Sequence, residues 1–263
     1  MRKHLINDGN IERNDTMKIY SDLIQFIDYI VNAVSNGKYL YYQINYIPEN
    51  KAVNEDYLNK LDEKMSNKYN ANLTKNQRLN LRRKDAARHL YVRYKNIVIL
   101  LKTVGFTEVA KNEKWKDIRR EKINLKITDN VIYNIGLGQG KSSKNKTLNS
   151  KITVTLSKDT LNLIKVSCLE AIRYKKSIRL LLYEWNKING FNGWSGINLQ
   201  KKQLRDYLVN EVCRSFGIKK KEAHKLFRVN TFRAKAQKHL DKAFLQEATE
   251  NGLGPPVASE LQV

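Results

Sequence analysis

The spacing of apolar residues changes twice along this chain, and the change limits the folds that the chain can adopt. Near the start, apolar residues recur at helical intervals, as in Leu23, Phe26 and Ile30. From Leu90 to Leu156 they alternate with polar residues, which is the period of a strand that buries one face. Beyond that point the helical interval returns. This order predicts an α+β fold with an N-terminal helix, an antiparallel sheet that has a basic face, and a helical C-terminal part.

The same pattern places the individual elements. Helices are expected over residues 17–35, 53–69, 74–88, 158–173, 176–189, 199–216 and about 219–247, and strands over residues 38–46, 90–95, 96–103, 118–128, 131–135 and 151–156. The predicted division is an α+β domain over residues 1–157 and a helical part over residues 158–250. Residues 251–263 hold two of the three prolines, and we expect a disordered tail there, outside the fold.

Positive charge is concentrated in the middle of the chain. The sequence has 49 Lys and Arg against 26 Asp and Glu, a net charge of +23. Residues 73–244 hold 40 of the basic and 13 of the acidic residues, whereas residues 1–72 hold 9 and 10. AT-rich codons would raise the lysine content, but they explain neither the fifteen arginines nor the uneven distribution. DNA or RNA is the expected partner, because each neutralised phosphate releases condensed counterions. An anionic membrane surface and simple solubility are the alternative explanations of the charge.

Cysteine usage and hydropathy indicate the compartment. Cys168 and Cys213 are the only cysteines, and they form neither a CxxC pair nor a disulfide framework. That usage indicates a reducing compartment. The first residues lack the apolar core of a signal peptide, and no stretch approaches the ~20 apolar residues of a membrane span. We therefore expect a soluble cytoplasmic protein with no membrane segment.

One face of the predicted sheet is expected to be basic. Its outward positions are Arg93, Lys122, Lys126 and Lys151, with Tyr91 among them. An antiparallel sheet can bury one face and leave the other in water, so these side chains would lie in solvent. An aromatic residue among cations favours stacking of single-stranded nucleic acid there. The alternative is an ordinary solvated face.

A second basic surface is predicted on the helix near residue 80. Residues 75–93 carry seven cations and one acid, Asp85. The cations are Lys75, Arg78, Arg82, Arg83, Lys84, Arg88 and Arg93. Arg78 and Arg82 lie one helical turn apart, where like charges repel unless a polyanion neutralises them. This density favours phosphate contact over a purely structural helix.

Residues 212–228 resemble the helix-turn-helix motif of DNA-binding proteins. The motif needs a small residue in its first helix, a glycine four positions later, and buried apolar residues in its second helix. Cys213, Gly217, Ile218, Ala223 and Leu226 have these offsets. The resemblance implies that the cations of this segment face the major groove or its phosphates, namely Lys219, Lys220, Lys221, His224, Lys225 and Arg228. A glycine-capped junction between ordinary helices, with a solvated lysine cluster, fits the same residues.

The glycine-rich segment Gly136–Ser143 (GLGQGKSS) follows an apolar strand, as a phosphate-binding loop does. The Walker pattern requires a glycine five positions before Gly140, where this chain has Ile135, and no helical pattern follows. We therefore expect a basic hairpin loop, in which Lys141 and Lys144 contact a nucleic-acid backbone, and no nucleotide site.

Enzyme signatures are sparse. The four histidines have no metal-ligand spacing. A carboxylate two positions before a lysine, as in restriction-type nucleases, occurs at Glu49 and at Asp62. Random placement would give roughly three or four such pairs, so these two indicate nothing. No catalytic residue, metal ligand or cofactor is predicted, and the question of catalysis stays open with a non-catalytic protein favoured.

We therefore predict a basic protein that binds DNA or RNA, of the kind found in mobile elements, replication systems or ribonucleoproteins. The residues expected to contact nucleic acid are Arg78, Arg82, Arg83, Lys84, Arg88, Arg93, Lys122, Lys126, Lys141, Lys144, Lys219, Lys220, Lys221, Lys225, Arg228 and Arg233. The alternative is a metal-dependent nuclease or strand-transfer enzyme whose carboxylates come from distant positions. A third hypothesis is an interaction scaffold whose charge reflects only codon bias.

Overall fold

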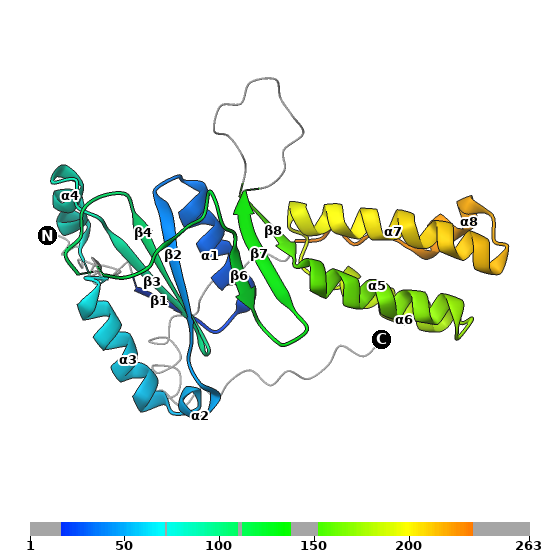
Figure 1. The fold of residues 1–263 in the computed structure, drawn as a ribbon, viewed down its shortest axis with the longest axis horizontal. Helices are drawn as coiled ribbons and strands as arrows, with labels where there is room; N and C mark the ends of the chain where they lie inside the picture. The colour runs from blue at the N-terminus through cyan, green and yellow to red at the C-terminus, as the bar shows by residue number, and fades with distance from the viewer. Residues whose placement is uncertain (1–16, 72, 110–111, 138–151, 234–263) are drawn as a thin grey trace, which may run out of the picture.

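The fold is α+β, as the spacing of apolar residues predicts (Figure 1). The computed structural model describes residues 17–71, 73–109, 112–137 and 152–233. Within these residues the chain forms a five-stranded sheet, a three-stranded sheet and eight helices. The two sheets lie together, and the C-terminal helices extend from them as an elongated helical part (Figure 1).

The five-stranded sheet is mixed. Its strands, in spatial order, are β1 (Met17–Tyr20), β3 (His89–Tyr94), β4 (Ile97–Thr103), β2 (Tyr39–Tyr46) and β5 (Lys116–Asp117). β1 runs parallel to β3, whereas the other neighbours are antiparallel. The prediction of a single antiparallel sheet is therefore wrong in two respects, because β1 is parallel and the later strands form a sheet of their own.

Helix α1 (Leu23–Ser35) begins later than predicted, because the preceding residues join the sheet as β1. Asp22 caps the helix, and its carboxylate accepts a hydrogen bond from the backbone N–H of Gln25 at 2.8 Å. The apolar stripe of α1 is buried as its spacing predicts, and consists of Phe26, Ile27, Ile30 and Val34.

Helices cover both faces of the five-stranded sheet. α1 packs on the face that carries Leu90 and Val92. Helix α3 (Glu55–Lys68) covers the opposite face, where Leu58 packs with Tyr91. The short helices α2 (Glu49–Ala52) and α4 (Lys75–Arg83) precede and follow α3 in the chain. Every residue of β3 is buried as a result, so the expectation that β3 leaves one face in water is wrong.

The three-stranded sheet packs its inner face into the same core as α1. Its antiparallel strands are β6 (Ile123–Lys126), β7 (Ile132–Leu137) and β8 (Ile152–Leu156). On the inner face Ile123, Ile135 and Val154 lie opposite one another and are fully buried. The hydroxyl of Tyr42 on β2 donates to the backbone carbonyl of Lys122 at 2.8 Å, which connects this sheet to the first.

Four helices follow β8, and they are α5 (Lys158–Arg173), α6 (Ile178–Asn189), α7 (Ser195–Phe216) and α8 (Lys220–Leu226). The predicted bounds of α5 are confirmed, and α6 begins two residues later than predicted. Trp185 on α6 is buried against Phe227, with ring centroids 5.5 Å apart.

Helix α8 ends earlier than predicted. The sequence predicts a helix to about residue 247, but α8 stops at Leu226 and the chain then returns along the helical part. The backbone N–H of Gly193 donates to the carbonyl of Phe232 at 2.9 Å, and the buried ammonium of Lys201 donates to the carbonyl of Asn230 at 2.9 Å. These bonds satisfy backbone carbonyls of an extended segment after α8. The same segment could not make them if the helix continued. Residues beyond 233, including the predicted tail, lie outside the described residues.

The helical part and the sheets share one hydrophobic core. The indole N–H of Trp194 donates to the carboxylate of Asp28 on α1 at 2.7 Å, which links α1 to the start of α7. The predicted domain boundary at residue 157 coincides with the junction between β8 and α5, and the division into domains stays a prediction. Among the residues described, no helix combines the length and hydropathy needed to cross a membrane.

Candidate nucleic-acid interface

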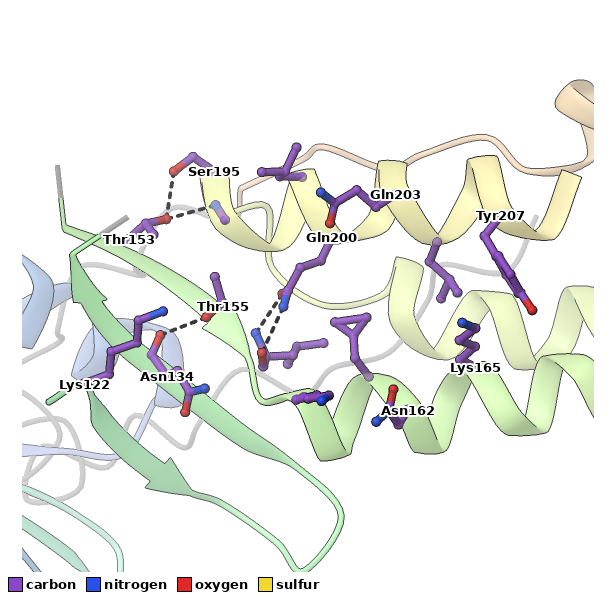
Figure 2. A pocket seen from close by; sticks show the side chains of 16 residues that line it. Lys122, Asn134, Thr153, Thr155, Asn162, Lys165, Ser195, Gln200, Gln203 and Tyr207 are labelled. Atoms are coloured by element: carbon purple, nitrogen blue, oxygen red, sulfur yellow. Dashed lines mark hydrogen bonds between the residues drawn. The ribbon is translucent and has the colours of Figure 1, made fainter. Parts of the chain in front are cut away.

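A groove of about 830 Å³ lies where the outer face of the three-stranded sheet meets α5 and α7 (Figure 2). Sixteen described residues line it, and none of these sixteen is acidic. They are Lys122, Asn134, Thr153, Thr155, Leu156, Lys158, Leu161, Asn162, Lys165, Ser195, Gly196, Leu199, Gln200, Gln203, Leu204 and Tyr207. Lysine, amide and hydroxyl side chains therefore surround an apolar floor of leucines.

The edge strand β8 is held to α7 by side chains that act on its backbone. The side-chain oxygen of Gln200 accepts from the N–H of Leu156 at 2.8 Å, and the amide N–H of Gln200 donates to the carbonyl of Leu156 at 2.9 Å. Gln200 thereby makes the backbone hydrogen bonds that a neighbouring strand would make at this edge. At the start of α7, the hydroxyl oxygen of Thr153 accepts from the N–H of Gly196 at 2.9 Å and lies 3.0 Å from the hydroxyl of Ser195.

Gly196 allows α7 to approach β8 directly. A Cβ at this position would lie 2.4 Å from the carbonyl oxygen of Val154 and 2.6 Å from Cγ2 of Thr155. A backbone carbonyl cannot move away without disturbing the sheet, so only glycine fits here. The width of the groove at its sheet end depends on this close contact.

The outer face of the three-stranded sheet continues the groove. Asn124, Asn134 and Thr155 form one row across β6, β7 and β8. Lys122 lies over Gly136 on β7, because a Cβ on that glycine would be only 2.6 Å from Cγ of Lys122. The absence of a side chain at Gly136 lets Lys122 extend over the sheet and line the groove (Figure 2).

Helix α5 supplies the other two lysines. Its first turn is capped by the side chain of Ser157. Lys158, Asn162 and Lys165 follow at helical spacing and lie on the stripe that faces the groove. The ammonium of Lys165 lies 3.9 Å from the ring centroid of Tyr207 on α7, a cation–π contact that fixes the position of this charge.

The electrostatic environment of the groove is positive. The salt bridges formed among the described residues involve neither Lys122 nor Lys158. The first turn of α7 adds the positive end of a helix dipole at the sheet end of the groove. Unpaired cations, amide and hydroxyl donors, and the lack of a lining carboxylate together favour an anionic ligand.

The sheet residues of the predicted interface lie in different environments. Lys122 lines the groove, and Lys126 lies on the same outer face, where it pairs with Asp129 at 2.7 Å. Arg93 is buried and pairs with Asp62 on α3. The prediction that Arg93 lies on an exposed basic face is wrong, because α3 covers that side of β3. Lys141, Lys144 and Lys151 lie outside the described residues.

The basic helix predicted near residue 80 is α4, which ends at Arg83. Thr74 and Gln77 form a capping box at its start. Arg82, Arg83 and Lys84 are exposed, whereas Arg78 and Arg88 are half-buried. α4 lies at the end of the molecule that is farthest from the helical part (Figure 1).

The junction predicted at residue 217 joins α7 to α8. Gly217 has φ +68° and ends α7 in the left-handed conformation, and Ala223 on α8 is fully buried. α8 has seven residues and lies at the end of α7 that is farther from the sheets (Figure 1). Lys219, Lys220, Lys221, Lys225 and Arg228 are exposed, and Arg233 pairs with Asp28 at 2.8 Å. A contact between this junction and DNA stays a prediction.

Sequence reasoning does not single out Lys158, Lys165, Gln203 or Tyr207. A signal was present in α5, where polar residues recur at i, i+4 and i+7 from Lys158. Such a stripe is usually a solvated helix face, and only its position opposite α7 makes it part of a groove. For metal chemistry, the described residues include no cluster of three His, Cys, Asp or Glu side chains that could share an ion.

No protein-family model, no curated protein and no solved structure matches this chain.

Proposed function

We propose that this protein binds nucleic acid without modifying it, and that the groove between the three-stranded sheet, α5 and α7 is its main contact surface. One observation carries the proposal: three lysines, four amides and four hydroxyls line the groove, and no carboxylate does. Phosphates suit such a surface, because lysines release counterions from them and neutral donors hold them in position. The outer sheet face, with Asn124 and Lys126, extends the same surface beyond the groove.

The basic residues of α4 and α8 are assigned a secondary role. α4 and α8 lie at opposite ends of the molecule, with the two sheets and α7 between them (Figure 1). Positive charge coincides with a cavity at the groove, whereas α4 and α8 present it on exposed helices. Their charges fit additional contacts to a long polyanion.

The alternative, a metal-dependent nuclease or strand-transfer enzyme, would need carboxylates beside the bound phosphate. No specific observation in the described part of the chain favours it. Cys168 and Cys213 are both free thiols, which fits a reducing compartment such as the cytoplasm. A non-catalytic binding role fits a component of a mobile element, a replication system or a ribonucleoprotein.

Fluorescence anisotropy with labelled DNA and RNA, measured with the full chain from about 50 to 200 mM salt, tests the proposal. We expect log K to fall linearly with log salt. The double variant Lys122→Gln/Lys158→Gln should bind more weakly, with a slope shallower by about one for each lost phosphate contact. The matched control, Lys60→Gln/Lys64→Gln, removes two exposed charges from α3. Absence of binding at low salt, or equal effects of the two double variants, would contradict the proposal.

A further inference from the structure

We propose that the groove binds unpaired nucleotides of a single strand, with phosphates on its lysines and bases against its leucine floor. This inference rests on the proposed function and names the form of nucleic acid that the groove accepts. Three observations carry it: the concave shape of the site, the spacing of its charges, and the apolar and amide side chains between them.

The shape of the groove does not suit a duplex. Proteins read duplex DNA by inserting a convex element, such as a helix, into the major groove. Here the surface is concave, with α5 on one side, α7 on the other and the sheet at one end (Figure 2). Its volume of about 830 Å³ falls within the range of sites that enclose small organic molecules, roughly 300–1,000 Å³. A few unstacked nucleotides fit such a space, whereas a duplex could touch only the rim.

The charges are spaced for a ligand with several phosphates. Lys158 and Lys165 lie two helical turns apart, which is roughly 10 Å along the axis of α5. Lys122 adds a third charge from the sheet. One phosphate group cannot contact charges separated in this way. Successive phosphates of a strand that runs along the groove can do so.

The floor of the groove is apolar and incompletely covered. Leu156 and Leu204 are buried beneath it, and Leu161 is half-buried. Leu199 on α7 lines the same groove, yet 54% of its surface is exposed. The face of an unstacked base that packs against Leu199 would remove this apolar surface from water. A second base farther along the strand can reach Tyr207, two turns on along α7 and beside the Lys165 ammonium.

The groove also offers amides to base edges. Asn162 on α5 and Gln203 on α7 have no hydrogen-bond partner among the described residues, whereas Gln200 is already engaged by the backbone of Leu156. Asn and Gln side chains pair with the donor and acceptor atoms of bases. A single strand presents its Watson–Crick edges to these amides, whereas a duplex uses those edges in base pairs.

The test compares labelled oligothymidylate and oligouridylate of about 12 nucleotides, a length within the range of known single-strand sites, with a duplex of equal length. The groove variant Leu199→Asp places a carboxylate on an exposed position of the floor. Its matched control is Leu180→Asp on α6, a helix that contributes no residue to the groove, where the leucine is also exposed. Circular dichroism checks that both variants fold.

We expect Leu199→Asp to weaken single-strand binding by about tenfold or more, which corresponds to the loss of one stacked base and one phosphate contact. Leu180→Asp should leave it within about twofold, and duplex binding should change little in either variant. An oligonucleotide that carries 5-iodouracil should crosslink to Tyr207 on irradiation. If Leu199→Asp proves poorly folded, Gln203→Glu provides the same test from a solvent-facing residue of α7.

Two results overturn the inference while leaving the proposed function intact. One is equal affinity for single strand and duplex with no effect of Leu199→Asp or Gln203→Glu. The other is a loss of affinity in these variants that is equally large for the single strand and for the duplex. If the wild-type chain binds neither form at low salt, the proposed function itself fails. Tighter binding of oligouridylate than of oligothymidylate supports the inference and identifies RNA as the source of the strand.

Discussion

The guanidinium of Arg93 on β3 binds both carboxylate oxygens of Asp62 on α3. Its Nε donates to Oδ1 at 2.8 Å, and one Nη donates to Oδ2 at 2.7 Å. The hydroxyl of Tyr91 donates to the same carboxylate at 2.5 Å. Both charged side chains are more than nine-tenths buried. This pair accounts for an arginine that the sequence assigns to a solvent-exposed binding face.

Replacing Arg93 should therefore affect folding and not binding. Arg93→Met leaves Asp62 buried with one hydroxyl partner, and we expect a loss of about 3–5 kcal/mol in the free energy of unfolding. Arg82→Met, at an exposed position of α4, should change it by less than about 0.5 kcal/mol. Urea unfolding of both variants measures the difference. Normal stability of Arg93→Met combined with weaker DNA or RNA binding would return this residue to the interface.

The acid side of the stability profile should depend on His89. Burial lowers the pKa of His89 to about 4, and the nearby Lys102 ammonium lowers it as well. Because the unfolded chain takes up this proton near pH 6.5, stability is intact above that pH and falls as the pH drops from 6.5 to 4. The loss attributable to His89 is about 3 kcal/mol, from 1.36 kcal/mol for each pKa unit.

The variant His89→Phe isolates this contribution. His89 packs against the rings of Tyr69 and Trp115, so a phenylalanine keeps an aromatic ring in the site. Urea unfolding at pH 7, 5.5 and 4.5 should show a flatter pH dependence for His89→Phe than for the wild-type chain. Parallel curves would mean that His89 is not the group responsible. The charge of Glu113 also acts on His89. Glu113 is the same residue in both proteins, so its own contribution to the pH dependence should not differ between them.

Lys201 should hold the returning segment after α8 in place. Its buried ammonium donates to the carbonyls of Asn189, Phe191 and Asn230 at 3.0, 2.6 and 2.9 Å. Lys201→Met keeps the packing but leaves these acceptors without a partner, at a cost of about 2–4 kcal/mol. Lys202→Met, at the exposed neighbouring position, is the control. Trypsin should cleave after Arg228 faster in Lys201→Met alone, and equal cleavage rates in the two variants would exclude this role.

Local patterns predict the helices of this fold well. Strands that form by pairing with a distant segment are predicted less well, because no local pattern records that pairing. The bounds of α5 follow from the Ser157 cap and from apolar spacing within the helix itself. Residues 17–20 have apolar spacing that continues into α1, so the sequence extends the helix over them. They form a strand because Met17 pairs with Tyr91 in a parallel register, a contact between residues more than seventy positions apart.

The residues of the candidate site are predicted incompletely for the same reason. The sequence selects Arg93 and passes over Lys158, whereas in the structure α3 covers Arg93 and Lys158 lines the groove. A signal for the buried pair does exist, because Asp62 lies on the stripe of α3 that also carries Leu58 and Ser66. A carboxylate in a buried stripe implies a buried cation. No comparable signal in the sequence places Lys158 opposite α7, because the two come together only in the tertiary structure.

Close packing at Gly196 should be required for the shape of the groove. Gly196→Ala places a methyl group against the carbonyl of Val154, and displacement of α7 should cost about 1–3 kcal/mol. Single-strand binding should weaken together with stability, because the groove opens at its sheet end. Gly190→Ala, at the C-cap of α6 and outside the groove, is the control, because a Cβ there would lie no closer than 3.3 Å to its nearest neighbour, the carbonyl oxygen of Asn186. Unfolding and anisotropy measurements that find Gly196→Ala unchanged in both properties would contradict the role of this contact.

The junction of α7 and α8 allows a decisive substitution. If it is a helix-turn-helix, Lys221 on the exposed side of α8 contacts base edges, and Lys221→Ala should relax sequence preference by about 1–3 kcal/mol between sites as well as lower affinity. If Lys221 contacts phosphates, the same variant should weaken binding uniformly and make the salt slope shallower. Gly217→Val does not separate these roles, since a Cβ at φ +68° is costly in either case. Selection from a random duplex library, followed by salt titration of the selected sites, distinguishes the two results. If neither the sequence preference nor the salt slope changes, Lys221 lies on a solvated face that does not contact nucleic acid. Seven residues make a short recognition helix, and we expect the phosphate result.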